Sequence, residues 1–317
     1  MKILITGIAG FIGSNAAEYF LNKGHEVFGI DNFNDYYDVK LKRDNAESVK
    51  DLGGHVLEAD LNSKEAFDHI INTNPDVIIH LAAQPGISST VSFNEYRQNN
   101  IDATYNVLEA ANKLENLHLF INIATSSVYG YDATISETEI PKPASYYGST
   151  KLAAEQLALM YHTTYGLPVT SFRLYSVIGP KERPDKLWTK IIDVTLNKKA
   201  PVEIYEGSRE HLRSFTNVFD ICEAFDKAIQ YKDNAIGEVF NIGSNQTITV
   251  GEGLDILEKV IGESLNIKDV NAKRIGDQTK TSAVITKAEK SLNWKPETDF
   301  KTSMQQAVDW FKNSIYI

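Results

Sequence analysis

Short apolar segments alternate with longer segments of helical periodicity along most of the chain. The apolar segments have the length of buried strands and lie at residues 2–6, 26–30, 55–59, 76–81, 119–124, 169–175 and 238–242. The segments of helical periodicity lie at residues 14–22, 64–72, 96–114, 151–165, 220–230, 250–261 and 302–311. Strands that are apolar nearly throughout and alternate with helices indicate a parallel sheet covered on both faces. The pattern therefore predicts an α/β fold with a doubly wound parallel sheet.

The alternation becomes irregular in the C-terminal half. Gly179-Pro180 begins a predicted long loop, because glycine and proline interrupt regular structure. The elements predicted beyond this loop are shorter and less regular. We expect residues 1–178 to form the main domain, with residues 218–243 returning to its sheet. Most of residues 179–317 should form a smaller α/β region packed on that sheet.

Three glycines, Gly7, Gly10 and Gly13, follow the first predicted strand and open the first predicted helix. Glycines at this turn let a phosphate approach the N–H groups of the helix N-terminus, although such a triplet also occurs in purely structural turns. Asp31 follows the second strand about 20 residues later, where a carboxylate accepts hydrogen bonds from a ribose 2′-hydroxyl and repels a 2′-phosphate. Asp60 closes the third strand, where an adenine edge can be recognised. Together these positions predict a Rossmann-type dinucleotide site that prefers NAD to NADP.

Tyr147 and Lys151 have the spacing Y-x-x-x-K, which places both side chains on one face of a helix. A lysine ammonium one turn away, with a positive nicotinamide nearby, would lower the pKa of the phenol and make it a general base near neutral pH. The spacing alone is common in helices. Upstream, Thr125, Ser126 and Ser127 follow the fifth strand, at the sheet edge where ligands of such folds bind. Their hydroxyls suit either a sugar hydroxyl or a simple strand-to-loop turn.

Composition narrows the class of function. The chain has 317 residues, a formal net charge of -10 and a single cysteine, Cys222. So acidic a chain is a poor general binder of nucleic acid or anionic membranes, and one cysteine allows neither an internal disulfide nor a cysteine metal cluster. We expect no signal peptide, and the sequence given shows no membrane-spanning run and no His, Asp or Glu spacing typical of a metal site. We expect a cytoplasmic protein without metal, nucleic-acid or membrane partners, which binds any anionic ligand through a few arginines.

Several motifs occur in one order along the chain: the glycine triplet, Asp31, His80-Leu81-Ala82-Ala83, Val128-Tyr129-Gly130 and the Tyr147/Lys151 pair. In this combination the chain resembles the extended short-chain dehydrogenase/reductase family, specifically its NAD-dependent nucleotide-sugar epimerases and dehydratases. The resemblance covers nearly the whole chain. It implies an NAD-binding Rossmann domain, a smaller nucleotide-sugar-binding region, and tightly bound NAD that is regenerated in each turnover. It also implies a homodimer formed through paired helices at residues 96–114 and 151–165.

The family's functional positions map onto this chain residue by residue. The resemblance implies Tyr147 as the catalytic base, Lys151 as its partner and Thr125 as the hydroxyl residue that accompanies them. The cofactor positions that it implies are Gly7, Gly10, Phe11, Ile12, Gly13, Asp31, Asn32, Asp60, Leu61, Leu81, Ala82, Ala83, Asn100, Tyr147 and Lys151. The substrate positions that it implies are Gln84, Ser88, Thr125, Ser126, Ser127, Ser176, Arg183, Arg213, Arg274 and Asp277. Two positions depart from the family pattern: Ala103 replaces a glycine, and Ser214 replaces the aspartate that usually follows the arginine at 213.

The same resemblance bears on the reaction. Nucleotide-sugar 4,6-dehydratases carry an Asp-Glu pair where this chain has Ser126 and Ser127, and a serine hydroxyl is too weak an acid to serve as a resting base. Without a second acid–base pair, a 4-keto sugar formed by hydride removal turns and takes the hydride back on its other face, which is 4-epimerisation. A dehydratase that uses Glu137 or Glu139 is a less favoured alternative. A non-catalytic NAD sensor would need no such base.

Two segments, residues 32–38 and 179–185, resemble UDP-glucuronate 4-epimerases in particular. In those enzymes an arginine at the position of Arg183 recognises the uronate, so the preferred reaction is UDP-glucuronate to UDP-galacturonate. Ser88 departs from this pattern, because those enzymes usually have an arginine there. A neutral substrate, either UDP-glucose/UDP-galactose or a UDP-N-acetylhexosamine, therefore stays open.

Overall fold

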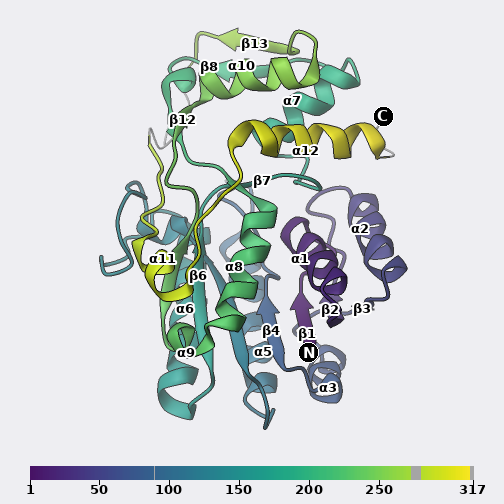
Figure 1. Cartoon of the computed structure of the whole chain (residues 1–317), viewed down its shortest axis with the longest axis vertical. Coiled ribbons are helices and arrows are strands. Elements are labelled where there is room, and N and C mark those ends of the chain that lie inside the picture. The colour runs from purple at the N-terminus through teal and green to yellow at the C-terminus, as the bar shows by residue number, and fades with distance from the viewer. Residues whose placement is uncertain (89, 273–279, 315–317) are drawn as a thin grey trace.

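A seven-stranded parallel sheet forms the centre of the protein. The computed structural model describes residues 1–88, 90–272 and 280–314 (Figure 1). The strands lie in the order β11-β6-β5-β4-β1-β2-β3, and every neighbouring pair is parallel. They are β1 (Lys2–Thr6), β2 (Glu26–Asp31), β3 (His55–Glu58), β4 (Val77–His80), β5 (Leu119–Thr125), β6 (Val169–Leu174) and β11 (Val239–Ile242). All seven predicted strands are confirmed, each end within one residue of its predicted position.

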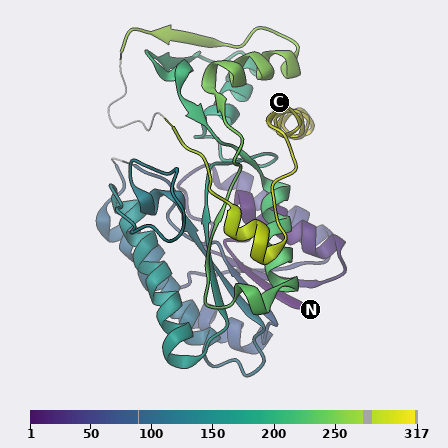
Figure 2. The ribbon, with the colours of Figure 1, turned by 60° about the vertical axis from the view of Figure 1, so that its left-hand side comes forward.

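Helices cover both faces of the sheet because its strands are apolar on both sides. Ile3 and Ile5 of β1 join one buried cluster with side chains of α1, α2, α8 and α11, whereas Leu4 joins a second cluster with side chains of α3, α5 and α6. The first set comprises α1 (Phe11–Asn22), α2 (Val39–Asp51), α8 (Val218–Gln230) and α11 (Thr286–Leu292), and the second α3 (Lys64–Thr73), α5 (Ala103–Ala111) and α6 (Tyr146–Tyr165). Figure 2 shows the long teal helix α6 and the purple helices α1 and α2 on opposite sides of the sheet. The doubly wound α/β fold is therefore confirmed.

A second packed unit, which we call the small lobe, lies above the carboxyl ends of the strands (Figure 1). It consists of α7 (Leu187–Leu196), β8 (Val202–Tyr205), α10 (Val250–Ile261), β13 (Ile267–Val270) and α12 (Phe300–Asn313). Strands β8 and β13 pair in parallel, and Trp188, Ile204, Leu257 and Val308 belong to a separate apolar core. The short strands between the two units are β7 (Val177–Ile178), β9 (Leu212–Arg213), β10 (Thr216–Asn217) and β12 (Ile248–Thr249). The short helix α9 (Lys232–Ala235) follows α8 at the end of the main sheet that lies away from the small lobe (Figure 1).

The chain passes between the main sheet and the small lobe several times. After α7 and β8 it returns to the main sheet for α8 and β11, and then it leaves again for α10 and β13. It returns once more for α11 and ends with α12 in the small lobe (Figure 1). None of the described helices is long and apolar enough to cross a membrane.

Two helical segments near the cavity differ from the sequence prediction. Helix α6 begins at Tyr146, five residues earlier than predicted, because the Ser145 side chain caps it by accepting a hydrogen bond from the Gly148 N–H. The predicted helix at 96–114 is α4 (Phe93–Tyr96), a π-helical turn (Arg97–Asp102) and α5 in succession. Such a turn often accompanies a functional site.

Candidate active site

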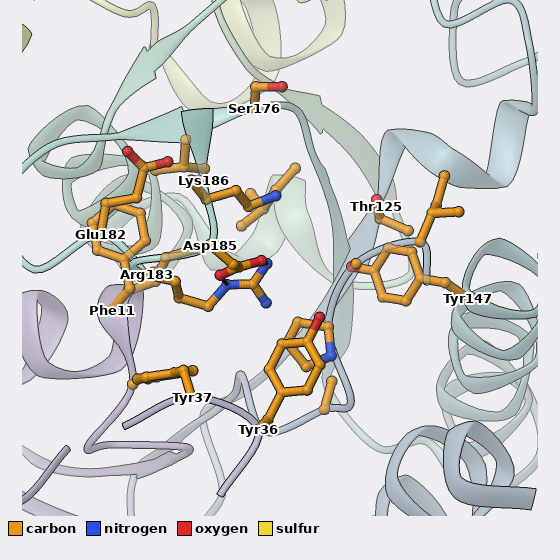
Figure 3. Close-up of a pocket in the computed structure, with 18 of the residues that line it drawn as sticks. Phe11, Tyr36, Tyr37, Thr125, Tyr147, Ser176, Glu182, Arg183, Asp185 and Lys186 are labelled. Carbon is orange, nitrogen blue, oxygen red and sulfur yellow. Dashed lines mark hydrogen bonds and ion pairs between the residues drawn. The ribbon is translucent and has the colours of Figure 1, made fainter. Parts of the chain in front are cut away.

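A cavity of about 1200 Å³ lies at the carboxyl ends of the sheet strands, beneath the small lobe (Figure 3). The loops after β1 to β6 line one part of it, and residues of α7, β8 and β9 line another. Ligands of open parallel sheets bind in this position. The predicted site residues that the structure describes all line this cavity, except Gln84, Ser88 and Asn100. Arg274 and Asp277 lie outside the described residues.

The glycine turn brings backbone segments closer together than other residues allow. Gly7 has a φ of 71°, and a Cβ atom on Gly13 would lie 2.1 Å from the Gly7 carbonyl oxygen. Helix α1 therefore starts at the cavity, and its N-cap residue, Gly10, provides no side-chain cap. The first N–H groups of a helix have no carbonyl partner within it and attract anions. The turn thus fits the pyrophosphate of a dinucleotide.

Asp31 lies buried at the end of β2, beside the cavity. Its carboxylate accepts hydrogen bonds from the N–H groups of Ala9 (3.1 Å) and Phe33 (2.9 Å). Burial raises the pKa of Asp31, and the Phe33 N–H and the Lys42 ammonium oppose that shift. Lys42, which the sequence motifs did not include, donates to the backbone oxygen and the side-chain oxygen of Asn34 at 2.7 and 2.6 Å. A carboxylate and an ammonium group near each other suit the hydroxyls of a ribose.

Tyr147 and Thr125 lie next to each other on one wall of the cavity (Figure 3). The Thr125 hydroxyl hydrogen-bonds the phenol and lowers the pKa of Tyr147, as does the charge of Arg183, but burial raises this pKa by more. In the protein by itself burial therefore dominates and the phenol is neutral near pH 7, whereas the expected lowering beside a positive nicotinamide stays a prediction. Gly148 allows α6 to approach the hydroxyl cluster, because a Cβ atom there would lie 2.5 Å from the Ser127 carbonyl oxygen.

Lys151 lies one turn after Tyr147 and is buried. Burial lowers the pKa of Lys151 to about 8, and Glu155, one turn further along α6, opposes the shift. Glu155 is fully buried and accepts hydrogen bonds of 2.9 and 2.6 Å from the guanidinium of Arg173 on β6. Arg173 also donates to the Tyr129 hydroxyl at 2.8 Å. This buried network fixes α6 against the sheet beside the predicted base.

Three predicted site residues, Gln84, Ser88 and Asn100, are not among the residues that line the cavity. The Asn100 side-chain oxygen accepts a hydrogen bond from the Gln84 N–H at 2.7 Å, and its amide nitrogen donates to the Thr150 hydroxyl at 3.0 Å. Asn100, buried in the π-helical turn, therefore ties the loop after β4 to α6. The Ser88 N–H donates to the Tyr96 hydroxyl at 3.2 Å. These contacts hold the loop after β4, whose residues Pro85, Gly86 and Ile87 line the cavity.

Arg183 projects from the wall opposite Tyr147 (Figure 3). Its Nε lies 3.1 Å from Asp185 Oδ1, and its Nη2 donates to Asp185 Oδ2 at 3.1 Å. The guanidinium lies 5.4 Å from the centroid of the Tyr36 ring, in cation–π range. The cavity thus has a phenol on one side and a buried cation on the other.

The structure adds cavity residues that the motifs did not include. They come from the loop after β2, from α2, from the segment that leads into α7 and from the small lobe. They include Tyr36, Tyr37, Lys42, Glu182, Asp185, Lys186, Lys190, Glu203, Tyr205, Ser208 and His211. For Tyr36, Tyr37, Glu182 and Asp185, the resemblance of segments 32–38 and 179–185 to UDP-glucuronate 4-epimerases was the sequence feature that pointed to the site. Lys42, Lys186, Lys190 and the small-lobe residues carry no local motif.

Comparison with known proteins assigns the chain to a family. The family described as GDP-mannose 4,6 dehydratase matches residues 4–307. The chain belongs to the extended short-chain dehydrogenase/reductase family. It is 32% identical to UDP-glucuronate 4-epimerase 6 of Arabidopsis thaliana, covering 98% of this chain and 71% of that protein. It is 34% identical to YtcB of Bacillus subtilis, described as an uncharacterized UDP-glucose epimerase, covering 100% and 99%.

A solved structure of this short-chain dehydrogenase/reductase family agrees closely with the fold. The crystal structure of UDP-glucuronic acid 4-epimerase from Bacillus cereus, in complex with UDP-glucuronic acid and NAD, matches with a TM-score of 0.90. The two chains are 34% identical, and the match covers 98% of this chain and 99% of that one. The predicted family and fold are confirmed.

Proposed function

We propose that the protein is an NAD-dependent UDP-sugar 4-epimerase that converts UDP-glucuronate to UDP-galacturonate. The observation that carries the proposal is a single cavity in which Tyr147 faces Arg183 and the glycine turn opens nearby. The relatives that are themselves named UDP-glucuronate 4-epimerases support it.

The residues around the cavity suit each part of the reaction. Bound NAD would supply the acceptor and donor of the C4 hydride. The N-terminus of α1 suits its pyrophosphate, and Asp31 with Lys42 suits its adenosine ribose. Tyr147 would start as the phenolate, favoured by the positive charge of bound NAD, and would take the proton of the C4 hydroxyl beside Thr125; as the phenol it returns that proton once the 4-keto sugar presents its other face. The Lys151 ammonium stabilises the phenolate from one turn away.

The carboxyl groups of the site are badly placed for a dehydratase. Glu137 accepts a hydrogen bond from the Asn241 N–H at 2.7 Å, and neither Glu137 nor Glu139 lines the cavity. Asp185 pairs with Arg183 on the wall opposite Thr125. Elimination would need an acid and a base next to the sugar carbons near Tyr147. The side chains beside Thr125 offer only hydroxyls, Ser126 and Ser127, which favours epimerisation.

The choice of sugar depends on charge. Arg183 keeps N–H groups beyond those that contact Asp185, and these can donate to the C6 carboxylate of a uronate. Ser88 supplies no cation to the cavity, and the Bacillus subtilis relative is named for UDP-glucose, so UDP-glucose or a UDP-N-acetylhexosamine is the second candidate.

Proton NMR tests the proposed function directly. The purified protein with NAD is incubated separately with UDP-glucuronate, UDP-glucose and UDP-N-acetylglucosamine. We expect UDP-galacturonate to appear from the first sugar, with little turnover of the other two. Conversion of a neutral sugar alone would replace the uronate assignment with the second candidate. Accumulation of a 4-keto sugar would contradict epimerisation.

We also propose that the protein is a homodimer that works in the cytoplasm. Tyr105 of α5 and Met160 and Tyr165 of α6 are large apolar side chains exposed on the helices that the family resemblance pairs. Analytical ultracentrifugation should then give twice the chain mass of 35.4 kDa. A species of one chain mass at micromolar concentration would rule the dimer out, and cell fractionation tests the location.

NAD and the nucleotide sugar are expected to bind to different parts of the chain. We propose that residues 1–178 together with 218–243 hold NAD, and that the rest of 179–317 holds most of the nucleotide sugar. Mass-spectrometric footprinting with NAD or with UDP alone should protect these two sets separately, and protection of one common set would contradict the division.

A further inference from the structure

The cavity wall opposite Tyr147 carries a cation that the family motifs do not include. Lys186 is the residue immediately before α7, and its side chain lines the cavity. Figure 3 shows its amino group pointing into the cavity on the same wall as the Arg183 guanidinium. Two positive charges on one wall repel each other, and a nearby anion would stabilise both.

Arg183 alone is a poor site for a carboxylate. Its guanidinium already forms two contacts of 3.1 Å with Asp185, so the pair as a whole carries no net charge. A substrate carboxylate that approached Arg183 would also approach the carboxylate of Asp185, and two like charges at close range repel each other. A further positive charge on the same wall would offset the repulsion between the substrate carboxylate and Asp185.

Lys186 supplies that charge. It forms no ion pair with the carboxylates that the structure describes, and solvent in the cavity reaches its side chain. The side chain is open to solvent only on its cavity side, and this enclosure together with the charge of Arg183 lowers the pKa of Lys186, whereas Glu182 and Asp185 oppose the shift. Glu182 is buried and accepts a hydrogen bond from the Thr189 hydroxyl at 3.1 Å. Burial raises the pKa of Glu182, which makes it a weak counter-charge for the lysine.

We propose that Lys186 binds the C6 carboxylate of the substrate together with Arg183, as a specificity-determining residue. The inference rests on the proposed conversion of UDP-glucuronate. Lys186 shares its wall with Arg183, the cation that the proposed function assigns to the C6 carboxylate, and the charge of Arg183 acts on Lys186. A carboxylate held at Arg183 therefore meets both positive charges.

Isothermal titration calorimetry on the NAD-loaded protein tests the role of Lys186. The ligands are UDP, UDP-glucose and UDP-glucuronate, and the variant is Lys186→Met, which keeps the length of the side chain and removes its charge. We expect binding of UDP-glucuronate to weaken by about tenfold or more, the effect of losing one hydrogen bond between charged groups. Binding of UDP and UDP-glucose should change by less than about twofold.

A matched control lies one turn further along the chain. Lys190 follows Lys186 by one turn of α7 and also lines the cavity. Lys190→Met removes the same charge and should leave the ratio of the UDP-glucuronate and UDP-glucose affinities unchanged. Lys186→Gln serves in the same comparison if the methionine variant fails to fold, as judged by UDP binding and thermal unfolding.

The outcomes separate this inference from the proposed function. Equal weakening of all three ligands by Lys186→Met would assign the lysine to the diphosphate and overturn the inference. Unchanged discrimination in the variant would overturn it as well, while leaving UDP-glucuronate as the substrate. A wild-type protein that binds UDP-glucuronate no better than UDP-glucose would instead overturn the uronate assignment itself.

Discussion

Replacing Tyr147 with phenylalanine is expected to lower kcat by about 10²–10⁴-fold, the usual contribution of a positioned general acid–base group. The change removes one oxygen from a ring that lines the cavity and hydrogen-bonds Thr125. Without that oxygen no group beside Thr125 can take the proton of the C4 hydroxyl. The sugar should still bind, because the cations that hold it lie on other walls. Proton NMR time courses give kcat, and calorimetry gives the dissociation constant of the UDP-sugar.

The adjacent tyrosine provides the control. Tyr146 is exposed, its ring contacts Phe93 at a centroid distance of 5.4 Å, and it does not line the cavity. Tyr146→Phe makes the same chemical change one residue away and should leave kcat within about a factor of two, as surface substitutions commonly do. If both variants lost activity equally, or if Tyr147→Phe kept most of its turnover, Tyr147 would not be the base.

Among the ion pairs discussed here, the buried pair of Glu155 and Arg173 should contribute most to the free energy of unfolding. Glu155→Gln keeps the shape of the side chain but leaves the Arg173 guanidinium buried beside a neutral amide. Breaking one partner of such a pair costs about 3–5 kcal/mol of unfolding free energy, because arginine cannot give up its proton. The guanidinium would keep its hydrogen bond to the Tyr129 hydroxyl but lose its only strong counter-charge among the described residues. Urea unfolding followed by circular dichroism measures the difference.

A second bidentate pair tests whether burial is the cause. Arg43 and Glu58 form two hydrogen bonds of 2.6 Å, but both side chains are about half exposed. Exposed pairs contribute little because water and salt screen them. Glu58→Gln should therefore leave the urea midpoint unchanged within error. Similar losses in Glu58→Gln and Glu155→Gln would show that the pairing itself, and not its burial, decides the cost.

Hydrophobic pattern was enough to place the strands, because β4 and β5 are buried on both faces and their residues read as continuous apolar runs. Helix α2 escaped prediction because Leu41, Ala46 and Val49 provide only a narrow apolar stripe on an otherwise polar segment. Helix α7 was missed because it follows directly on a segment rich in charge and proline.

Site residues that share a local sequence motif could be predicted. Site residues that come together only when distant segments pack against each other could not. Tyr147 and Lys151 share one helix, so their spacing reveals them. Lys186 lies 39 residues beyond Tyr147 in the sequence, and only the packing of α7 over the sheet brings the two to opposite walls. The direction of the Tyr147 pKa shift was also out of reach, because burial, which outweighs Thr125 and Arg183, depends on the whole surrounding fold.

The repeated passage of the chain between the main sheet and the small lobe restricts how such an enzyme can change its substrate in evolution. The small lobe is encoded in three separate stretches of the gene, with α8 and β11 between the first and the second and α11 between the second and the third. A recombination event that exchanged the lobe as one block would also exchange part of the central sheet. A point substitution on the existing wall leaves the sheet intact, and the exchange of a single lysine there changes the charge that a substrate meets.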